Sequence, residues 1–395
     1  MLSFEKKIMD YIKNNIVLFL GIIITICSII IRLKFWDFES SDYTYFLYEW
    51  FKIIRHSGGL VGLQGNFYNY YIPYMCIITL PTYFHRIDYF EFMVYLKTIS
   101  VISEFVCALL AMRIANKVIE ENIYKKYILL AVYVCVICSP MVIFDGAIWA
   151  QCDYIYAAFI LWGIDRLIKE KYLFAFILFG CAFSFKLQTI FILPALAIIY
   201  FCKKKFSILQ FLWIPFMYLL SGLPAILWGK GIKETYTIYF GQVDSTDTLT
   251  ANAPNFWTFF PHDTRFSFLG ISILVILFSF VLIICLQKKG ELDNKDILWL
   301  FSMSAGLCFM FLPGMHERYC SLWMLFAYVY CLLYKKKGLI LVFIMDIFTC
   351  MTYMSFLYYG TYNVVVPYWI ISLGGMLLLC VVGITGAKRL LSLER

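Results

Sequence analysis

Charged residues are scarce in this sequence, and no hydrophilic stretch is long enough to form a second folded domain. Only 15% of the 395 residues are charged, whereas 63% are hydrophobic. A soluble domain of this length cannot bury that much apolar surface. The apolar residues also come in blocks long enough to cross a bilayer, such as 16–31, 207–228 and 339–354. The composition therefore predicts one all-α polytopic membrane domain over residues 1–395.

Several motifs that would indicate other chemistry are absent. The sequence has no G-x-x-x-x-G-K-[ST] phosphate loop, no H-E-x-x-H zinc motif and no G-x-S-x-G nucleophile turn. Its 14 cysteines include one C-x-x-C pair, Cys135 and Cys138, which lies in an apolar run and is interpreted as two buried inert thiols. These absences disfavour an internal nucleotide-driven engine, a zinc protease and a serine hydrolase.

Hydrophobic runs predict about twelve membrane crossings, several of them shorter than the roughly 20 residues that a perpendicular helix needs. Short helices are tolerable where they line a cavity instead of lipid. The segment 71–84 is apolar but short and contains Pro73 and Pro81, so we interpret it as a juxtamembrane or re-entrant helix on the outer side. The expected spans are residues 16–33, 92–114, 127–144, 154–168, 172–184, 189–201, 207–228, 267–287, 297–312, 320–334, 338–357 and 367–387.

Basic residues are distributed unevenly between the predicted loops. With the N-terminus placed inside, about two thirds of the 33 lysines and arginines fall on the inner side. This bias follows the positive-inside rule and predicts that both termini are cytoplasmic. It also accounts for the net charge of +8, so no nucleic-acid partner is expected. The polar pieces of the outer side are then residues 34–70, 145–153, 229–266 and 313–319, with Lys186 at a further tight turn.

The first outer loop opens with three acids, Asp37, Glu39 and Asp42, directly after the first membrane helix. A carboxylate at the membrane surface could act as general base towards a hydroxyl group, with a neighbouring acid such as Glu39 contacting the substrate. The alternative is a solvated loop with ordinary surface acids. Aromatic residues follow in the same loop. They suit stacking against sugar rings, and they equally fit an interfacial belt.

The segment 149–153 reads W-A-Q-C-D and opens a predicted helix on the outer side. Asp153 stands in the first turn of that helix, where the helix dipole favours an anion. A capping role alone is the alternative. Trp149 and Gln151 precede the acid and are candidate substrate contacts.

Lys186 and Gln188 interrupt an apolar run of about thirty residues with a cation and an amide. An ionisable group at this depth indicates a functional site. The expected ligand of the lysine is a phosphate, to which an ammonium offers a compact charge. The alternative is that the side chain snorkels towards the outer headgroups.

A base, an acid, a cation and a phenol stand together in one turn between two predicted helices, as His316, Glu317, Arg318 and Tyr319. An arginine can grip phosphate oxygens in bidentate fashion. The histidine and the acid could orient that arginine or polarise an acceptor hydroxyl. The alternative is a turn whose charges only satisfy one another.

The long outer loop contains the segment A-P-N-F-W at residues 253–257. Asn255 and Trp257 suit hydrogen bonding and stacking against a substrate. Ordinary turn chemistry at Pro254 and Asn255 explains the same residues.

Taken in order, these motifs resemble those of bacterial GT-C-type membrane glycosyltransferases related to the eukaryotic GPI mannosyltransferase II. The resemblance rests on the acidic first outer loop with Asp42, an N-Y-x-x-P-Y segment at residues 69–74, and the motifs W-x-Q-x-D, S-F-K-x-Q and H-E-R-Y. It runs over residues 15–335, which is most of the chain.

The resemblance implies many helices around an outward-facing cavity, with Asp42 as general base. It implies that Lys186, His316 and Arg318 contact the phosphate of a polyprenyl-phosphate hexose, mannose-like, held in the bilayer. The acceptor would be a hydroxyl of a glycan or glycolipid, and single displacement would invert the anomeric centre. No cofactor is required, although the acid cluster could bind a divalent metal.

Three other functions remain open at this point. A transporter or flippase of a lipid-linked saccharide would need charged or broken helices near the middle of the bilayer. A polysaccharide polymerase or ligase that uses a diphosphate-linked glycan would favour a larger basic outer loop than residues 229–266. A purely structural membrane subunit would leave Lys186 and the turn with Arg318 unexplained.

Overall fold

Helices form nearly all of the regular structure in the computed structural model, which describes residues 3–244, 248–260, 263–288, 290–358 and 366–391. Within these ranges the strands are β1 (Thr250–Ala251) and β2 (Met315–His316), which pair in parallel. The prediction of an all-α protein is therefore confirmed.

Each expected span contains a helix. These helices are α2 (Ile16–Leu33), α5 (Tyr89–Val118), α6 (Lys125–Ile137), α8 (Asp153–Ile168), α9 (Tyr172–Phe185), α10 (Leu193–Lys203), α11 (Trp213–Leu227), α14 (Ser267–Gln287), α15 (Asn294–Phe311), α16 (Ser321–Tyr334), α17 (Lys336–Leu357) and α18 (Tyr368–Leu390). Hydropathy could locate these helices because each of them places apolar side chains against neighbouring helices or in contact with lipid.

In the described ranges, six helices are long and apolar enough to cross a membrane, and a seventh crossing results if the bent pair 125–137 and 140–148 is one span. The six are Ile16–Leu33, Tyr89–Val118, Ile208–Leu227, Thr264–Gln287, Lys337–Leu357 and Tyr368–Leu390. The chain is thus a multi-pass membrane protein by length and composition. Shorter apolar helices such as α9 and α10 pack against other helices of the bundle. A helix that is covered by its neighbours does not have to be long enough to cross the hydrocarbon by itself.

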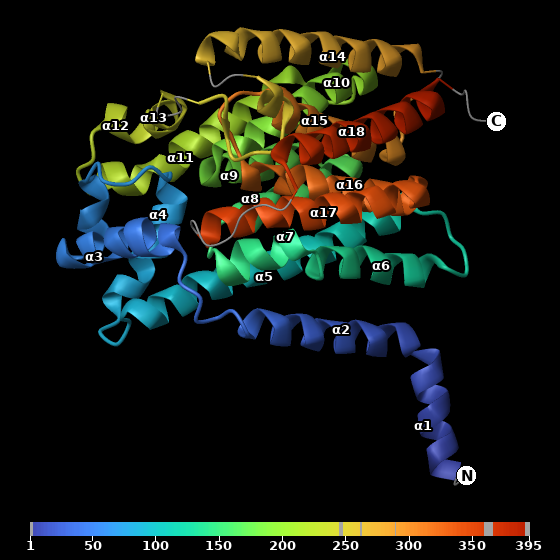
Figure 1. Ribbon diagram of the computed structural model, residues 1–395, viewed down its shortest axis with the longest axis horizontal. Coiled ribbons are helices and arrows are strands. Elements are labelled where there is room, and N and C mark those ends of the chain that lie inside the picture. Colours follow the sequence, from blue (N-terminus) through green and yellow to red (C-terminus); the bar gives the residue numbers. More distant parts are fainter. Residues whose placement is uncertain (1–2, 245–247, 261–262, 289, 359–365, 392–395) are drawn as a thin grey trace.

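The long helices lie side by side, with α2 at one edge of the bundle and α14 at the opposite edge (Figure 1). At one end gather α3 (Tyr48–His56), α4 (Ile72–Thr79), α12 (Ile232–Tyr236) and α13 (Ile238–Asp244). Both ends of the chain lie towards the other end of the bundle, where α1 (Ser3–Asn14) runs across the direction of α2. The polar loops and the termini are therefore separated by the length of the bundle.

The segment read as non-spanning forms α4 followed by the 3₁₀ turn η3 (Leu80–Tyr83). Pro73 stands in the first turn of α4, where its missing N–H leaves no hydrogen bond unmade. The combined element is shorter than the length needed to cross a bilayer.

The expected burial of the C-x-x-C pair is only partly observed. Cys135 is half-buried, but Cys138 is exposed, and both thiols are free. The reason is local: α6 ends at Ile137, so Cys138 stands at the bend before α7 (Pro140–Ile143).

The loop that follows α2, residues 34–70, is fixed to the bundle by an aromatic cluster and by a buried cation. Phe51 stacks on Phe92 of α5 at 4.1 Å between ring centroids, and Tyr71 stacks on Tyr218 of α11 at 4.0 Å. Lys97 of α5 donates to three loop carbonyls, those of Phe35 (2.9 Å), Trp36 (3.1 Å) and Phe38 (2.7 Å). These contacts hold the loop that carries Asp42.

Candidate active site

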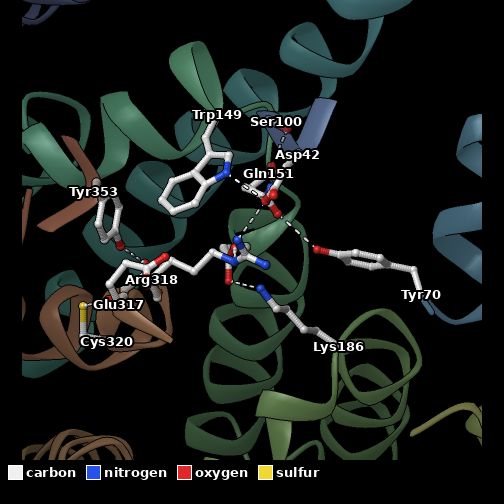
Figure 2. A network of polar contacts seen from close by, with 12 residues as sticks. Asp42, Tyr70, Ser100, Trp149, Gln151, Lys186, Glu317, Arg318, Cys320 and Tyr353 are labelled. Carbon is white, nitrogen blue, oxygen red and sulfur yellow. Dashed lines mark hydrogen bonds and ion pairs between the residues drawn. The ribbon is translucent and has the colours of Figure 1, made fainter. Parts of the chain in front are cut away.

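The carboxylate of Asp42 accepts hydrogen bonds from three side chains that are more than 100 residues away from it in the sequence. Trp149 Nε1 and Gln151 Nε2 each donate to Oδ2 at 2.9 Å, and Arg318 Nη1 donates to the same oxygen at 3.1 Å (Figure 2). In the described part of the chain, no hydrogen bond uses the other oxygen, Oδ1. A general base needs a fixed carboxylate that keeps an oxygen open to the reacting hydroxyl. Asp42 meets both conditions.

Two π-helical turns present these groups to one another. Asp42 precedes the turn η1 (Tyr43–Leu47), and Trp149 follows the turn η4 (Phe144–Ile148). Ala150 then adopts φ +60°, a left-handed conformation that is unfavourable for a residue with a Cβ atom. Wide turns and strained residues cluster at functional sites because the surrounding structure must hold them in place.

Hydrogen bonds to the backbone and to an amide fix the strained turn. Ser40 Oγ donates to the carbonyl of Trp149 at 3.1 Å, and Ser100 Oγ donates to the carbonyl of Gln151 at 2.6 Å. The hydroxyl of Tyr70 donates to Gln151 Oε1 at 3.1 Å, which orients the amide so that its N–H group points to Asp42. The carboxylate is thus supported by a second layer of contacts.

Lys186 and Arg318 converge on Asp153, the first residue of α8. Lys186 Nζ donates to Asp153 Oδ1, and Arg318 Nε lies 3.8 Å from Asp153 Oδ2. The predicted helix start at Asp153 is confirmed, but its carboxylate binds the lysine instead of capping the helix. Lys186 is buried, with its ammonium 5.1 Å from the ring centroid of Tyr319, so it does not snorkel to the surface.

Burial and neighbouring cations change the protonation of two residues in the turn at β2. The pKa of His316 is lowered to about 4 by burial and by the charges of Arg318 and Lys186, so its imidazole is neutral at physiological pH. Burial raises the pKa of Glu317 to about 7. Neither carboxylate oxygen of Glu317 has a hydrogen-bond partner among the described residues. Figure 2 shows Glu317 near Cys320 and Tyr353, on the far side of Arg318 from Lys186.

A cavity of about 200 Å³ opens beside Asp42. Aromatic and apolar side chains form much of its wall, and Asp42, Gln151 and Arg318 supply polar groups. This combination suits a sugar, whose ring faces stack on aromatic rings and whose hydroxyls need hydrogen-bond partners. The lining residues are Asp42, Phe46, Leu47, Trp50, Asn69, Tyr70, Gln151, His316, Arg318 and Phe356.

A second cavity of about 140 Å³ adjoins the first across a shared wall. The two cavities have Asn69, Tyr70, His316 and Arg318 in common. Lys186 lines only the second, so Arg318 stands between the carboxylate of Asp42 and the lysine. The second cavity is lined by Asn69, Tyr70, Phe185, Lys186, Gln188, Tyr239, Gln242, His316, Arg318 and Tyr319.

A third cavity of about 380 Å³ continues from the second towards α14. The two share Gln188, Gln242 and Tyr319. Most of the remaining wall is apolar, with Ile190 and Ile271 among its side chains. The three cavities therefore form a row that begins at Asp42, passes the two cations and ends at an apolar compartment.

Six residues predicted to contact substrate line none of the three cavities, namely Glu39, Trp149, Asp153, Asn255, Trp257 and Glu317. Glu39 accepts a hydrogen bond from the hydroxyl of Tyr89 at 2.9 Å on the outside of the loop. Asn255 caps a 3₁₀ turn by accepting from Trp257 N at 3.2 Å. The indole N–H of Trp257 donates to the carbonyl of Leu312 at 3.0 Å. These polar groups serve the local structure, as the turn interpretation of 253–257 anticipated.

Glu317 also lines none of the cavities, whereas its neighbours His316, Arg318 and Tyr319 do. Successive residues of a short 3₁₀ turn point in different directions. Sequence alone did not single out Tyr70 and Phe356 as individual site residues. The N-Y-x-x-P-Y segment contained a signal for the first, but nothing local marks the second.

In the part of the chain that the structure describes, no group of three or more His, Cys, Asp or Glu is placed to hold a metal ion. No protein-family model matches the chain, and no curated protein matches it. The resemblance to GT-C-type glycosyltransferases therefore stays a prediction based on the motifs, and the geometry of the site is the basis for a functional proposal.

Proposed function

We propose that the protein transfers a hexose, mannose-like, from a polyprenyl-phosphate donor to a hydroxyl of a glycan or glycolipid. The observation that carries this proposal is the anchoring of Asp42, in which three donors engage Oδ2 and Oδ1 is left without a hydrogen bond among the described residues. The side chain of Asp42 is 18% exposed and lines the cavity of about 200 Å³. A general base needs one oxygen open.

The chemistry follows from the row of cavities. The acceptor oxygen attacks the anomeric carbon, and Asp42 takes the acceptor proton. The bond between the anomeric carbon and the phosphate oxygen breaks, and polyprenyl phosphate leaves with the electron pair. Lys186 and Arg318 stabilise the additional negative charge on the leaving phosphate. Attack opposite to the leaving group inverts the configuration of the sugar.

The third cavity supports a lipid-linked donor over a soluble one. It is largely apolar, and it adjoins the cavity that contains Lys186. One wall belongs to α14, which stands at the edge of the bundle (Figure 1). A polyprenyl chain in this compartment would place its phosphate beside the two cations and its sugar beside Asp42.

The local charges favour a monophosphate over a diphosphate donor. Lys186 and Arg318 supply two positive charges, and Asp42 and Asp153 offset both. A diphosphate adds more negative charge than a phosphodiester, and the described pocket has no surplus cation to balance it. This balance argues against a polymerase or ligase that uses a diphosphate-linked glycan.

The topology belongs to the same proposal. We place twelve crossings in the membrane, with the short helices α8, α9, α10, α15 and α16 shielded from lipid by their neighbours. The positive-inside rule then puts both termini in the cytoplasm and the cavities on the outer side.

A flippase is the main competing function, because buried charges also occur deep in the helices. The Arg32 guanidinium pairs with Glu104 at 2.7 Å, and Asp346 accepts from the Tyr328 hydroxyl at 2.5 Å and from Met141 N at 3.0 Å. These groups are engaged by partners on neighbouring helices, which is typical of packing contacts and less so of a transport path.

The experiment incubates the purified protein with a panel of polyprenyl-phosphate hexoses and candidate acceptors, and follows both by mass spectrometry. A transferase releases polyprenyl phosphate and adds the mass of one anhydrohexose to the acceptor. A flippase would move the donor across a membrane and leave it chemically intact. Intact donor with every hexose and acceptor, from protein that is folded, would overturn the proposal.

A further inference from the structure

One buried carboxylate gathers four cations at the end of the bundle opposite to the cavities. Asp165 of α8 is fully buried. Arg113 Nε (3.2 Å) and Lys117 Nζ (3.3 Å) of α5 approach its Oδ1, while Arg166 Nε (3.4 Å) and Lys169 Nζ (3.1 Å) approach its Oδ2. We name these five residues the Asp165 cluster.

The position of the Asp165 cluster follows from helix geometry. Ser100 of α5 binds the carbonyl of Gln151 beside the cavities, and Arg113 stands thirteen residues further along the same helix. At 1.5 Å per residue, the cluster lies about 20 Å from the level of Ser100. This separation places it near the other surface of a bilayer whose hydrocarbon core is about 30 Å thick.

The cluster carries more positive charge than its carboxylate can offset. One acid balances one of four cations, and the remaining three repel one another at close range. Acids nearby in the sequence have other partners: Glu170 pairs with Lys205 at 3.0 Å, and Glu120 pairs with Lys295 at 3.2 Å. A structural ion pair would need only one or two of these cations, so the excess points to an external anion.

The four cations are held in place and yet remain accessible. The side chain of Arg113 is 49% exposed, and those of Lys117, Arg166 and Lys169 are between 22% and 27% exposed. Asp165 anchors all four from beneath, which lowers the entropy that each would lose on binding a ligand. The result is a positively charged site whose outer surface is free to bind an anion.

We propose that the Asp165 cluster binds the phosphate group of an anionic phospholipid. Lipid phosphates lie at the depth where α5 and α8 leave the hydrocarbon, and basic pockets between membrane helices bind such headgroups. The two guanidinium groups match phosphate oxygens in pairs, and the two ammonium groups add compact charge. This proposal does not depend on the chemistry assigned to Asp42.

The test measures binding of phosphatidylglycerol and phosphatidylcholine to the purified full chain by native mass spectrometry. The double variant Lys117→Gln/Lys169→Gln keeps both arginines on Asp165, and Lys125→Gln/Lys126→Gln on α6 is the control with the same loss of charge. We expect the first pair to weaken phosphatidylglycerol binding roughly ten- to thirty-fold. The control should change it less than about three-fold. An equal loss in both variants, or equal binding of phosphatidylcholine by the wild type, would overturn the proposal.

Two further measurements distinguish a built lipid site from a general effect of charge and from a site for free phosphate. Asp165→Asn adds net positive charge but removes the carboxylate that anchors the four cations. The proposal therefore expects weaker phosphatidylglycerol binding by this variant. Tighter binding, which the added charge alone predicts, would contradict the proposal. Inorganic phosphate at millimolar concentration should not displace the lipid. Displacement would identify a site for free phosphate instead. Thermal unfolding in detergent checks that each variant is folded, and Arg166→Gln, which also removes a cation of the cluster, replaces Lys117→Gln/Lys169→Gln if that variant is not.

Discussion

Arg318 Nη1 donates to Asp42 Oδ2 at 3.1 Å and so joins two residues that are 276 positions apart in the chain. The same guanidinium group lines both the cavity beside Asp42 and the cavity that contains Lys186. One side chain therefore touches the proposed base and the proposed phosphate site. Because the two sites share this arginine, donor binding and the position of the base are expected to depend on each other.

The first prediction concerns the base. Asp42→Asn removes the proton acceptor but keeps the size of the side chain, so transfer should fall by about two to four orders of magnitude while the protein still folds. The rate of acceptor glycosylation by purified protein measures this. Asp37→Asn, an exposed acid in the same loop, is the control and should transfer at the wild-type rate. Normal transfer by Asp42→Asn would remove this residue as base.

The second prediction concerns the shared arginine. In Arg318→Lys a single ammonium group cannot serve both the carboxylate and the phosphate, so kcat/KM should fall by about two to three orders of magnitude. Arg265→Lys makes the same chemical change at a side chain that is 89% exposed, and it should have little effect. Steady-state kinetics with the natural donor measures kcat/KM for both variants. A wild-type value for Arg318→Lys would mean that neither contact matters for transfer.

The third prediction separates stability from binding at Lys186. Lys186→Met leaves the buried Asp153 with only the longer ion pair to Arg318, which should lower the free energy of unfolding by up to about 3–5 kcal/mol. The double variant Lys186→Met/Asp153→Asn should recover most of that loss in thermal unfolding. Its affinity for the donor should stay low, because the phosphate contact is still missing. Recovery of donor affinity together with stability would show that the lysine serves only the fold.

The fourth prediction tests Lys97 as a positioning residue for the loop that carries Asp42. Lys97→Met removes the ammonium group that donates to three loop carbonyls, so the loop should loosen and kcat should fall roughly ten- to a hundred-fold. Donor KM should change little, because Lys97 lines neither the phosphate cavity nor the cavity of Asp42. The control is Lys52→Met, which removes a partly exposed lysine from α3. A change in KM alone would contradict the assignment.

The fifth prediction is a pH dependence of stability that arises from Glu317. Its pKa rises from the ordinary 4.5 to about 7 on folding, so the folded state holds this proton where the unfolded state has lost it. The stability that this residue contributes is present below about pH 4.5 and disappears as the pH rises through about 7. The loss is about 3 kcal/mol. Glu317→Gln should flatten this part of the pH profile in thermal unfolding, and Asp37→Asn should not. An unchanged profile in Glu317→Gln would assign the dependence to other groups.

Hydropathy located the helices but could not count the crossings. Apolar residues predominate both in α2, at the lipid surface, and in α15, inside the bundle. Yet α2 is mostly exposed, whereas nearly every side chain of α15 is buried. Whether a short apolar helix crosses the membrane depends on what its neighbours cover, and local sequence carries no record of those neighbours.

The sequence by itself determined the all-α membrane class, the helix start at Asp153 and the presence of polar groups that apolar surroundings make costly. It could select Lys186 and Arg318 for that reason, since an unpaired charge among apolar helices is rarely kept without a use, whereas the choice of Asp42 rested on the family resemblance. Only the tertiary structure decided the pairing. It joined Arg318 to Asp42 and Lys186 to Asp153, and it assigned Asn255 to a local turn. Partners in an ion pair are chosen by distance in space, and distances across hundreds of residues are set by helix packing and not by order along the chain.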